Sequence, residues 1–274
     1  MKRVWGLGLV LFSFQLFAAD RVLLVGEGGW ASCKQGIDHQ FIAEQFSNLL
    51  SNLKRSFPNK RFVTLTTCTE FAAAKLGRAI PYRYIDEAGR ATYGYHSSSA
   101  IHQLIAQRTT ADTAVFLIGH SHGGWLAMKA TAGLTNVWGL FSIEPISADE
   151  CDVRDYLMNR SKRPIPRRQV IVAGCRQAPS DVSVAAIQRA TPNWFNYHLD
   201  EREFRGDLHS SSIYGATNVP FPLGQGKDSH HLLGLDYRVW TDICLRTSQI
   251  LGESRASCPA IQVDRNGRII ARLN

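Results

Sequence analysis

A short glycine-rich segment, Gly119-His120-Ser121-His122-Gly123-Gly124, lies between an apolar run and a stretch of helical composition. A strand that is followed at once by a helix needs a sharp turn, and a serine at its apex takes a strained backbone conformation that lifts its hydroxyl above the sheet. Side chains two residues before and after that serine would collide, which accounts for Gly119 and Gly123. The segment therefore predicts a strand, a tight turn and a helix, with Ser121 as a candidate nucleophile.

Strands and helices alternate along the chain, which predicts an α/β fold with a mainly parallel central sheet and helices on both faces. Residues 20–274 are expected to form one such domain. A loop over 201–229, rich in Gly, Ser and Pro, is expected to cover the site. Hairpins are expected over 82–93 and, as a C-terminal hairpin, over 261–270. The expected strands are 21–25, 61–66, 113–118, 137–143, 169–173 and 194–199, and the expected helices are 38–57, 97–107 and 238–250.

Residues 1–19 have the composition of a signal peptide. Lys2 and Arg3 precede an uncharged apolar stretch that ends in Ala18-Ala19, and a basic start followed by a short apolar segment and small residues is typical of a cleaved leader. The apolar stretch is short for a membrane span of about 20 residues. We therefore expect a secreted or periplasmic protein.

Six cysteines follow this leader: Cys33, Cys68, Cys151, Cys175, Cys244 and Cys258. An even number in an oxidising compartment indicates disulfides, and the wide spacing lacks the paired pattern of zinc sites, so no metal is expected. Cys68 and Cys175 each close a strand-like run, and loops at the same sheet edge can bring them partners. We favour the pairs Cys33–Cys68, Cys151–Cys175 and Cys244–Cys258, although six cysteines allow many other pairings.

The chain carries a net charge of +8, from 31 basic and 23 acidic residues. Its basic residues are scattered apart from Arg160-Ser161-Lys162-Arg163 and Arg167-Arg168, and no aromatic residues interleave with a basic stripe. This pattern argues against a nucleic-acid partner. A moderately basic exported protein is still attracted to anionic surfaces, so transient contact with a membrane surface is compatible with the charge.

A serine hydroxyl is a weak nucleophile at neutral pH, so it needs a histidine base, and that base needs a carboxylate to orient it. His230 and His231 follow every credible acid, which gives the chain order serine, acid, histidine. We favour His230, which follows Ser229 on a predicted loop before the last long helix, and His231 is the alternative. His198 and His209 fit less well, because they lie in a predicted strand and in the predicted loop.

Two carboxylates, Glu144 and Asp200, are the main candidates for the acid, and Asp149 and Asp181, each in a predicted loop, are weaker alternatives. Glu144 ends a predicted strand immediately before Pro145. At the carboxyl end of a parallel strand its side chain would face the crevice in which α/β sheets bind ligands. Asp200 follows the predicted strand over 194–199, so the same argument applies to it. We favour Glu144, and Asp200 remains the alternative.

The oxyanion of an acyl-transfer step needs two backbone N–H donors. His122, the residue after the nucleophile, is expected to supply one. The other is expected from the Gly26-Glu27-Gly28-Gly29 loop after the first strand, with Gly28 as the candidate, because glycines permit unusual backbone angles. This loop lacks the third glycine and the acidic ribose partner of a dinucleotide-binding motif, so a dinucleotide cofactor is not expected.

With these residues the chain resembles the α/β-hydrolase superfamily, and within it the bacterial lipase- and esterase-like members that carry a Gly-His-Ser-His-Gly-Gly turn. Ile143-Glu144-Pro145 is similar to the strand-ending acid and proline of pancreatic-type lipases, where the acid is usually Asp. The resemblance implies an α/β-hydrolase fold without cofactor or metal, and attack of Ser121 on an acyl carbonyl followed by hydrolysis of the acyl-enzyme.

We therefore expect a monomer that hydrolyses carboxylic esters, with a small-molecule or lipid ester as its partner. A peptidase or a thioesterase would use the same three side chains. A catalytically silent fold of this type would act as a binding protein instead.

Overall fold

A computed structural model of the chain describes residues 19–29, 37–69, 81–95, 98–145, 183–199, 212–221, 229–253, 257–258, 260–263 and 269–273. Ten strands and six helices lie in these ranges. The strands are β1 Arg21–Glu27, β2 Arg61–Thr69, β3 Pro81–Asp86, β4 Ala91–Tyr95, β5 Thr113–His120, β6 Val137–Ile143, β7 Trp194–Leu199, β8 Thr217–Phe221, β9 Ala260–Val263 and β10 Ile269–Leu273. The helices are α1 Ile37–Ser56, α2 Ser98–Ala106, α3 His122–Ala132, α6 Val184–Ala190, α7 Ser229–Leu235 and α8 Tyr237–Ile250.

Eight strands form one sheet in the order β4-β3-β2-β1-β5-β6-β7-β8. Six neighbouring strands pair in parallel: β2, β1, β5, β6, β7 and β8. Strands β3 and β4 add an antiparallel hairpin beside β2. The expected α/β fold with a mainly parallel sheet is therefore confirmed, as is the hairpin over 82–93. The expected strand over 169–173 lies outside the described residues.

The strand order reverses between β1 and β5. From β1 the chain runs outward through β2, β3 and β4, and then returns through α2 to β5 on the other side of β1. In α/β sheets of this kind, ligands bind outside the carboxyl ends of the strands at such a point. The Glu27-Gly28-Gly29 loop and Ser121 lie at these two strand ends.

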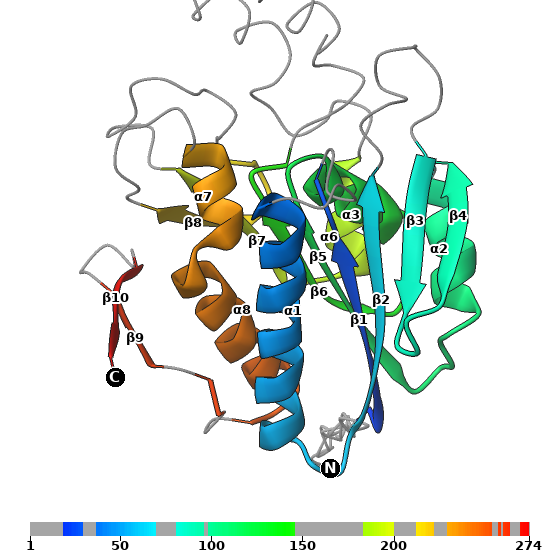
Figure 1. Cartoon of the computed structure of the whole chain (residues 1–274), viewed down its shortest axis with the longest axis horizontal. Coiled ribbons are helices and arrows are strands. Elements are labelled where there is room, and N and C mark those ends of the chain that lie inside the picture. Colours follow the sequence, from blue (N-terminus) through cyan, green and yellow to red (C-terminus); the bar gives the residue numbers. More distant parts are fainter. Residues whose placement is uncertain are drawn as a thin grey trace, which may run out of the picture.

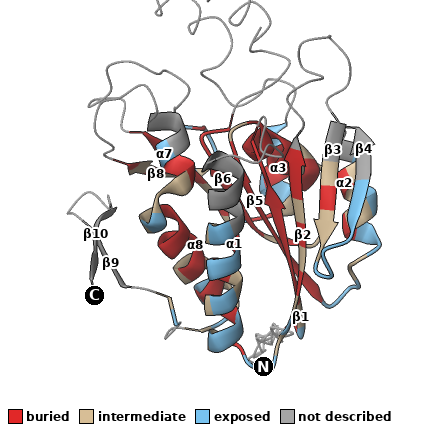
Figure 2. Ribbon diagram, in the orientation of Figure 1, coloured by how far each residue is buried: buried red, intermediate tan, exposed pale blue. Residues whose placement is uncertain are grey.

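Helices cover both faces of the sheet, with α1, α7 and α8 on one side and α2, α3 and α6 on the other (Figure 1). Alternate residues of β1 serve the two layers: Val22 and Leu24 pack toward α1 and α8, whereas Leu23 and Val25 pack toward α2 and α3. A strand buried on both faces needs a continuous apolar run rather than an alternating one. Figure 2 shows the central strands buried and the outer side of α1 exposed.

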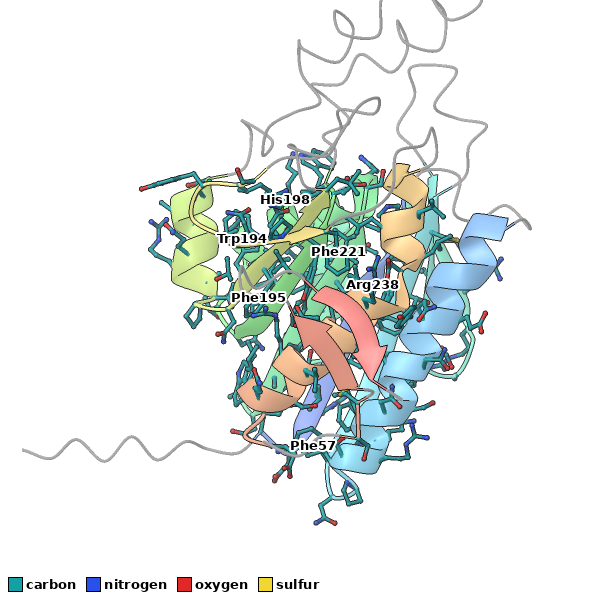
Figure 3. All side chains as sticks on the ribbon, turned by 90° about the vertical axis from the view of Figure 1, so that its left-hand side faces the viewer. Phe57, Trp194, Phe195, His198, Phe221 and Arg238 are labelled. Atoms are coloured by element: carbon teal, nitrogen blue, oxygen red, sulfur yellow. A yellow bond between two sulfur atoms is a disulfide. The ribbon has the colours of Figure 1, made fainter. Side chains whose placement is uncertain are left out.

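The expected loop over 201–229 is wrong for two segments. Residues 217–221 form β8, the last strand of the sheet among the described residues, and an edge position of this kind tolerates the missing N–H of Pro220. Phe221 anchors this strand, since its buried ring lies 5.4 Å from the guanidinium carbon of Arg238 on α8 (Figure 3). Helix α7 begins at Ser229, so His230 and His231 lie in a helix and not in the expected loop.

The C-terminal hairpin forms as expected from β9 and β10, which pair antiparallel and contact α8. A disulfide joins Cys244 of α8 to Cys258, with 5.9 Å between their Cα atoms, and so ties the tail to the domain. Cys68 is also disulfide-bonded, and its partner lies outside the described residues. Cys33, Cys151 and Cys175 lie outside them as well.

Candidate active site

Ser121 forms the turn between β5 and α3 with the strained backbone that the sequence predicts. Its φ of 57° and ψ of −127° lie in a region that residues with a side chain rarely adopt. A Cβ atom at Gly119 would overlap the backbone of Gly123, and one at Gly123 would overlap the Glu27 carbonyl group. Glycine at both positions therefore lets the helix start directly above the strand.

Ser121 is the one solvent-accessible residue of the strand, turn and helix segment over 113–128. Every residue of 113–128 is buried except Ser121, which is half-buried. The turn thus exposes a single residue between a buried strand and a buried helix segment. A nucleophile has to reach its substrate, and this exposure provides that access.

Glu144 lies directly beside the turn and has a strained backbone too. The Ser121 N–H donates to the Ile143 carbonyl at 2.9 Å, and the Glu144 N–H donates to the Tyr197 carbonyl at 2.9 Å. Glu144 has a φ of 42° and is 1% exposed. Among the described residues, Ser121 and Glu144 are the two non-glycine residues with positive φ. Such strain tends to gather at functional sites.

The alternative acid, Asp200, lies outside the described residues. It directly follows β7, whose last residue is Leu199. The neighbouring His198 is buried, and its Nδ1 atom lies 2.8 Å from the Leu199 carbonyl oxygen. His209 also lies outside the described residues.

Helix α7 carries both candidate bases in its first turn and packs against the residue before the nucleophile. A Cβ atom at Gly234 would lie 2.8 Å from three ring atoms of His120, which is 5% exposed. The indole N–H of Trp240 donates to the Gly234 carbonyl at 2.8 Å. Residues three and four apart share one face of a helix, so backbone positions 230 and 231 lie one turn from the contact with His120.

His122 is the residue predicted to supply the first oxyanion donor. His122 is the first residue of α3, where backbone N–H groups point out of the helix end toward a developing negative charge. Its ring is buried and stacks on Trp125, with 4.9 Å between ring centroids. The imidazole thus packs in the core, and only the amide is suited to act at the turn.

The structure argues against Gly28, the residue predicted to supply the second oxyanion donor. The Gly28 N–H donates to the Thr67 carbonyl at 3.0 Å, so its hydrogen is already used within the sheet. The next residue, Gly29, approaches the nucleophile, because a Cβ atom there would lie 3.1 Å from the Ser121 Cβ. The sequence does not show which of Gly28 and Gly29 approaches Ser121, because a local motif does not encode the hydrogen bond that Gly28 makes to Thr67 on the next strand.

Glu27 is a buried carboxyl that sequence analysis did not single out. It is 1% exposed and accepts a hydrogen bond from the Thr67 hydroxyl. Burial raises the pKa of Glu27 to about 8, and the Thr67 hydrogen bond lowers it in part. The only signal in the sequence was a charged residue within a glycine-rich strand end.

Within the described part of the chain, no group of His, Cys, Asp or Glu side chains has the arrangement of a metal site.

Comparisons with solved structures find hydrolases at low identity. The chain is similar to the lipase-esterase related protein of Clostridium acetobutylicum, at 12% identity over 85% of this chain and 96% of that one, with a TM-score of 0.40. It is similar to 2,6-dihydroxy-pseudo-oxynicotine hydrolase, at 11% identity over 86% and 62% of the two chains, with a TM-score of 0.44. The corresponding values for LpqC, the poly(3-hydroxybutyrate) depolymerase of Bordetella parapertussis, are 14%, 86%, 71% and 0.33. No protein-family model and no curated protein matches the chain.

By its own strand order the molecule has an α/β fold with a mainly parallel sheet, and a strained turn at Ser121 joins β5 to α3. Its candidate site lies at the point where the strand order reverses, between the ends of β1, β5 and β6.

Proposed function

We propose that the protein is an exported serine hydrolase that cleaves carboxylic esters through an acyl-enzyme, with lipid esters or other acyl esters as its substrates. The observation that carries this proposal is the Ser121 turn, with φ 57° and ψ −127°, between a buried strand and a buried helix. A strained backbone conformation destabilises the folded chain, and such strain is found mainly where it serves a function. An accessible serine hydroxyl at this position can serve as a nucleophile.

In the proposed reaction the Ser121 oxygen bonds to the acyl carbon, and its proton passes to the imidazole of His230 or His231. Glu144 holds that imidazole in the correct tautomer and stabilises its cation. The carbonyl oxygen, now negatively charged, accepts hydrogen bonds from the amides of His122 and Gly29. The alcohol leaves with the proton from the imidazole, and water then hydrolyses the acyl-enzyme by the same route.

Export is part of the proposal and has its own support. The sequence begins with the features of a signal peptide, and three of the six cysteines are oxidised among the described residues. Disulfides persist mainly in oxidising compartments. None of the described helices combines the length and the hydropathy needed to cross a bilayer.

The test is hydrolysis of p-nitrophenyl acetate and p-nitrophenyl octanoate by the wild type, Ser121→Ala and Ser51→Ala. Ser51 is an exposed serine on α1 and provides a matched control. Ser121→Ala is expected to lose turnover by at least about 1,000-fold, while Ser51→Ala retains it. Turnover by Ser121→Ala at the wild-type rate would reject the serine mechanism.

A further inference from the structure

A row of polar side chains crosses the sheet beneath the candidate oxyanion loop. Glu27 of β1 pairs in register with Thr67 of β2, and Thr67 pairs with Tyr84 of β3. Residues paired in register share a face of the sheet, and all three are buried. On its other side Glu27 pairs with Gly119, two residues before Ser121. The row therefore ends at the nucleophile turn, although the proposed reaction uses none of its side chains.

Thr67 holds the Glu27-Gly28 dipeptide at two points. Its carbonyl accepts the Gly28 N–H at 3.0 Å, and its hydroxyl donates to Glu27 Oε2. The same dipeptide supports the turn, because the Glu27 carbonyl lies so close to Gly123 that a Cβ atom there would overlap it. A displacement of this dipeptide would thus reach both the start of α3 and Gly29.

The surroundings of Glu27 favour the neutral acid. Burial raises its pKa to about 8, and among the described residues its second oxygen, Oε1, has no hydrogen-bond partner. Among the described residues of β3, the Tyr84 hydroxyl is the titratable group that senses Glu27, since its pKa is raised by burial and then by Glu27. Gly119 on β5 and Gly123 on α3 bring no charge, and the titratable side chain at the start of α3, the buried imidazole of His122, stacks on Trp125. An ionised Glu27 would therefore need water that the closed arrangement excludes.

We propose that Glu27 and Thr67 are positioning residues that hold the Gly28-Gly29 loop against Ser121, and that this loop loosens when the Glu27 carboxyl ionises. The inference rests on the proposed function, because it concerns the oxyanion-binding half of the same site. Its consequence is a hydrolase whose turnover declines in mildly alkaline solution through a group that never contacts the substrate.

The first test compares substitutions at two neighbouring threonines of β2, with p-nitrophenyl acetate as substrate. Thr67→Val removes the hydroxyl at nearly constant shape, Thr67→Ser retains it, and Thr66→Val makes the same change on the opposite face, where the hydroxyl donates to the Ile85 carbonyl at 3.4 Å. Thr67→Val is expected to lower kcat by roughly 10- to 100-fold with little change in KM, because a misplaced oxyanion donor weakens transition-state binding. Thr67→Ser is expected to restore kcat, and Thr66→Val to match the wild type.

The second test uses the pH dependence of kcat. The wild type is expected to lose turnover as the pH rises through about 8, whereas Glu27→Gln, which cannot ionise but still accepts the Thr67 hydrogen bond, is expected to lack this decline. The carboxyl carbon of Glu27, followed by NMR in the whole protein, is expected to titrate over the same range. This signal does not depend on catalysis and remains informative if Thr67→Val fails to fold.

Equal kcat for Thr67→Val and Thr66→Val, or the same alkaline decline in the wild type and Glu27→Gln, would overturn the inference while leaving the proposed function intact. A Glu27 carboxyl that titrates below pH 6 would overturn it too. If the wild type shows no hydrolysis that depends on Ser121, the proposed function fails and this inference fails with it.

Discussion

At the scale of single residues, the candidate site contains two strained positions, Ser121 and Glu144, which backbone hydrogen bonds between adjacent strands bring close together. The Ser121 position could be predicted because its glycines obey a local steric rule. The neighbourhood of Glu144 could be anticipated from the parallel order of the strands. The bond from Gly28 to Thr67 could not, because it joins segments 39 residues apart and depends on strand register.

The acid is tested by Glu144→Gln, which preserves size but removes the charge that stabilises an imidazolium. We expect kcat to fall on the order of 10³- to 10⁴-fold, with the unfolding midpoint measured alongside. Asp200→Asn is the paired control and should cause a mild loss. The opposite ranking of the two variants in steady-state kinetics would move the acid to Asp200.

Glu27 yields a prediction for stability. The folded protein keeps the carboxyl protonated up to about pH 8, while the unfolded chain loses this proton near pH 4.5, so the free energy of unfolding falls as pH rises between these values. Glu27→Gln removes this dependence. It should be more stable than the wild type by about 3 kcal/mol at pH 7 but not below pH 4. Urea denaturation at both pH values measures this difference, and an equal effect at both would contradict a buried neutral Glu27.

At the scale of elements, the strands and helices with strong periodicity were predictable, and those governed by tertiary contacts were not. Strand β8 contains a proline and lies in a segment rich in turn-forming residues, so only its place at the sheet edge explains it. Helix α7 is short, and its contact with His120 through Gly234 helps to fix it. A short helix of this kind is stabilised mainly by tertiary packing, so its local sequence does not predict it.

The contact between α7 and β5 can be tested by Gly234→Ala. The added methyl group would lie 2.8 Å from the His120 ring and should displace the helix that carries His230 and His231. We expect a loss of about 1–3 kcal/mol in the free energy of unfolding together with a lower kcat. In a double-mutant cycle with His120→Ala, which makes room for the methyl group, the two changes should cost less together than the sum of each alone. Strict additivity would show that the contact does not fix α7.

At the scale of the whole molecule, one layer of helices covers each face of the sheet, and a disulfide holds the C-terminal tail against α8. The Cys244–Cys258 bridge closes a loop with a sequence separation of 14 residues on α8, and Ser257 donates its N–H to Ser56 Oγ at the end of α1. Replacing both cysteines by alanine should lower the free energy of unfolding by about 3 kcal/mol while kcat hardly changes. Urea denaturation and ester hydrolysis of the same preparation measure both effects. A collapse of kcat at unchanged stability would instead link the tail to the site.

The central claim is that Ser121 becomes acylated during turnover. The most direct measurement is peptide mapping by mass spectrometry of protein quenched in acid within the first turnovers of p-nitrophenyl acetate. The account predicts one acetyl group on the peptide that contains Ser121, and none on the Ser121→Ala protein. Sustained ester hydrolysis with an acetyl group on another residue, or with no acylated peptide even under conditions that slow deacylation, would contradict it.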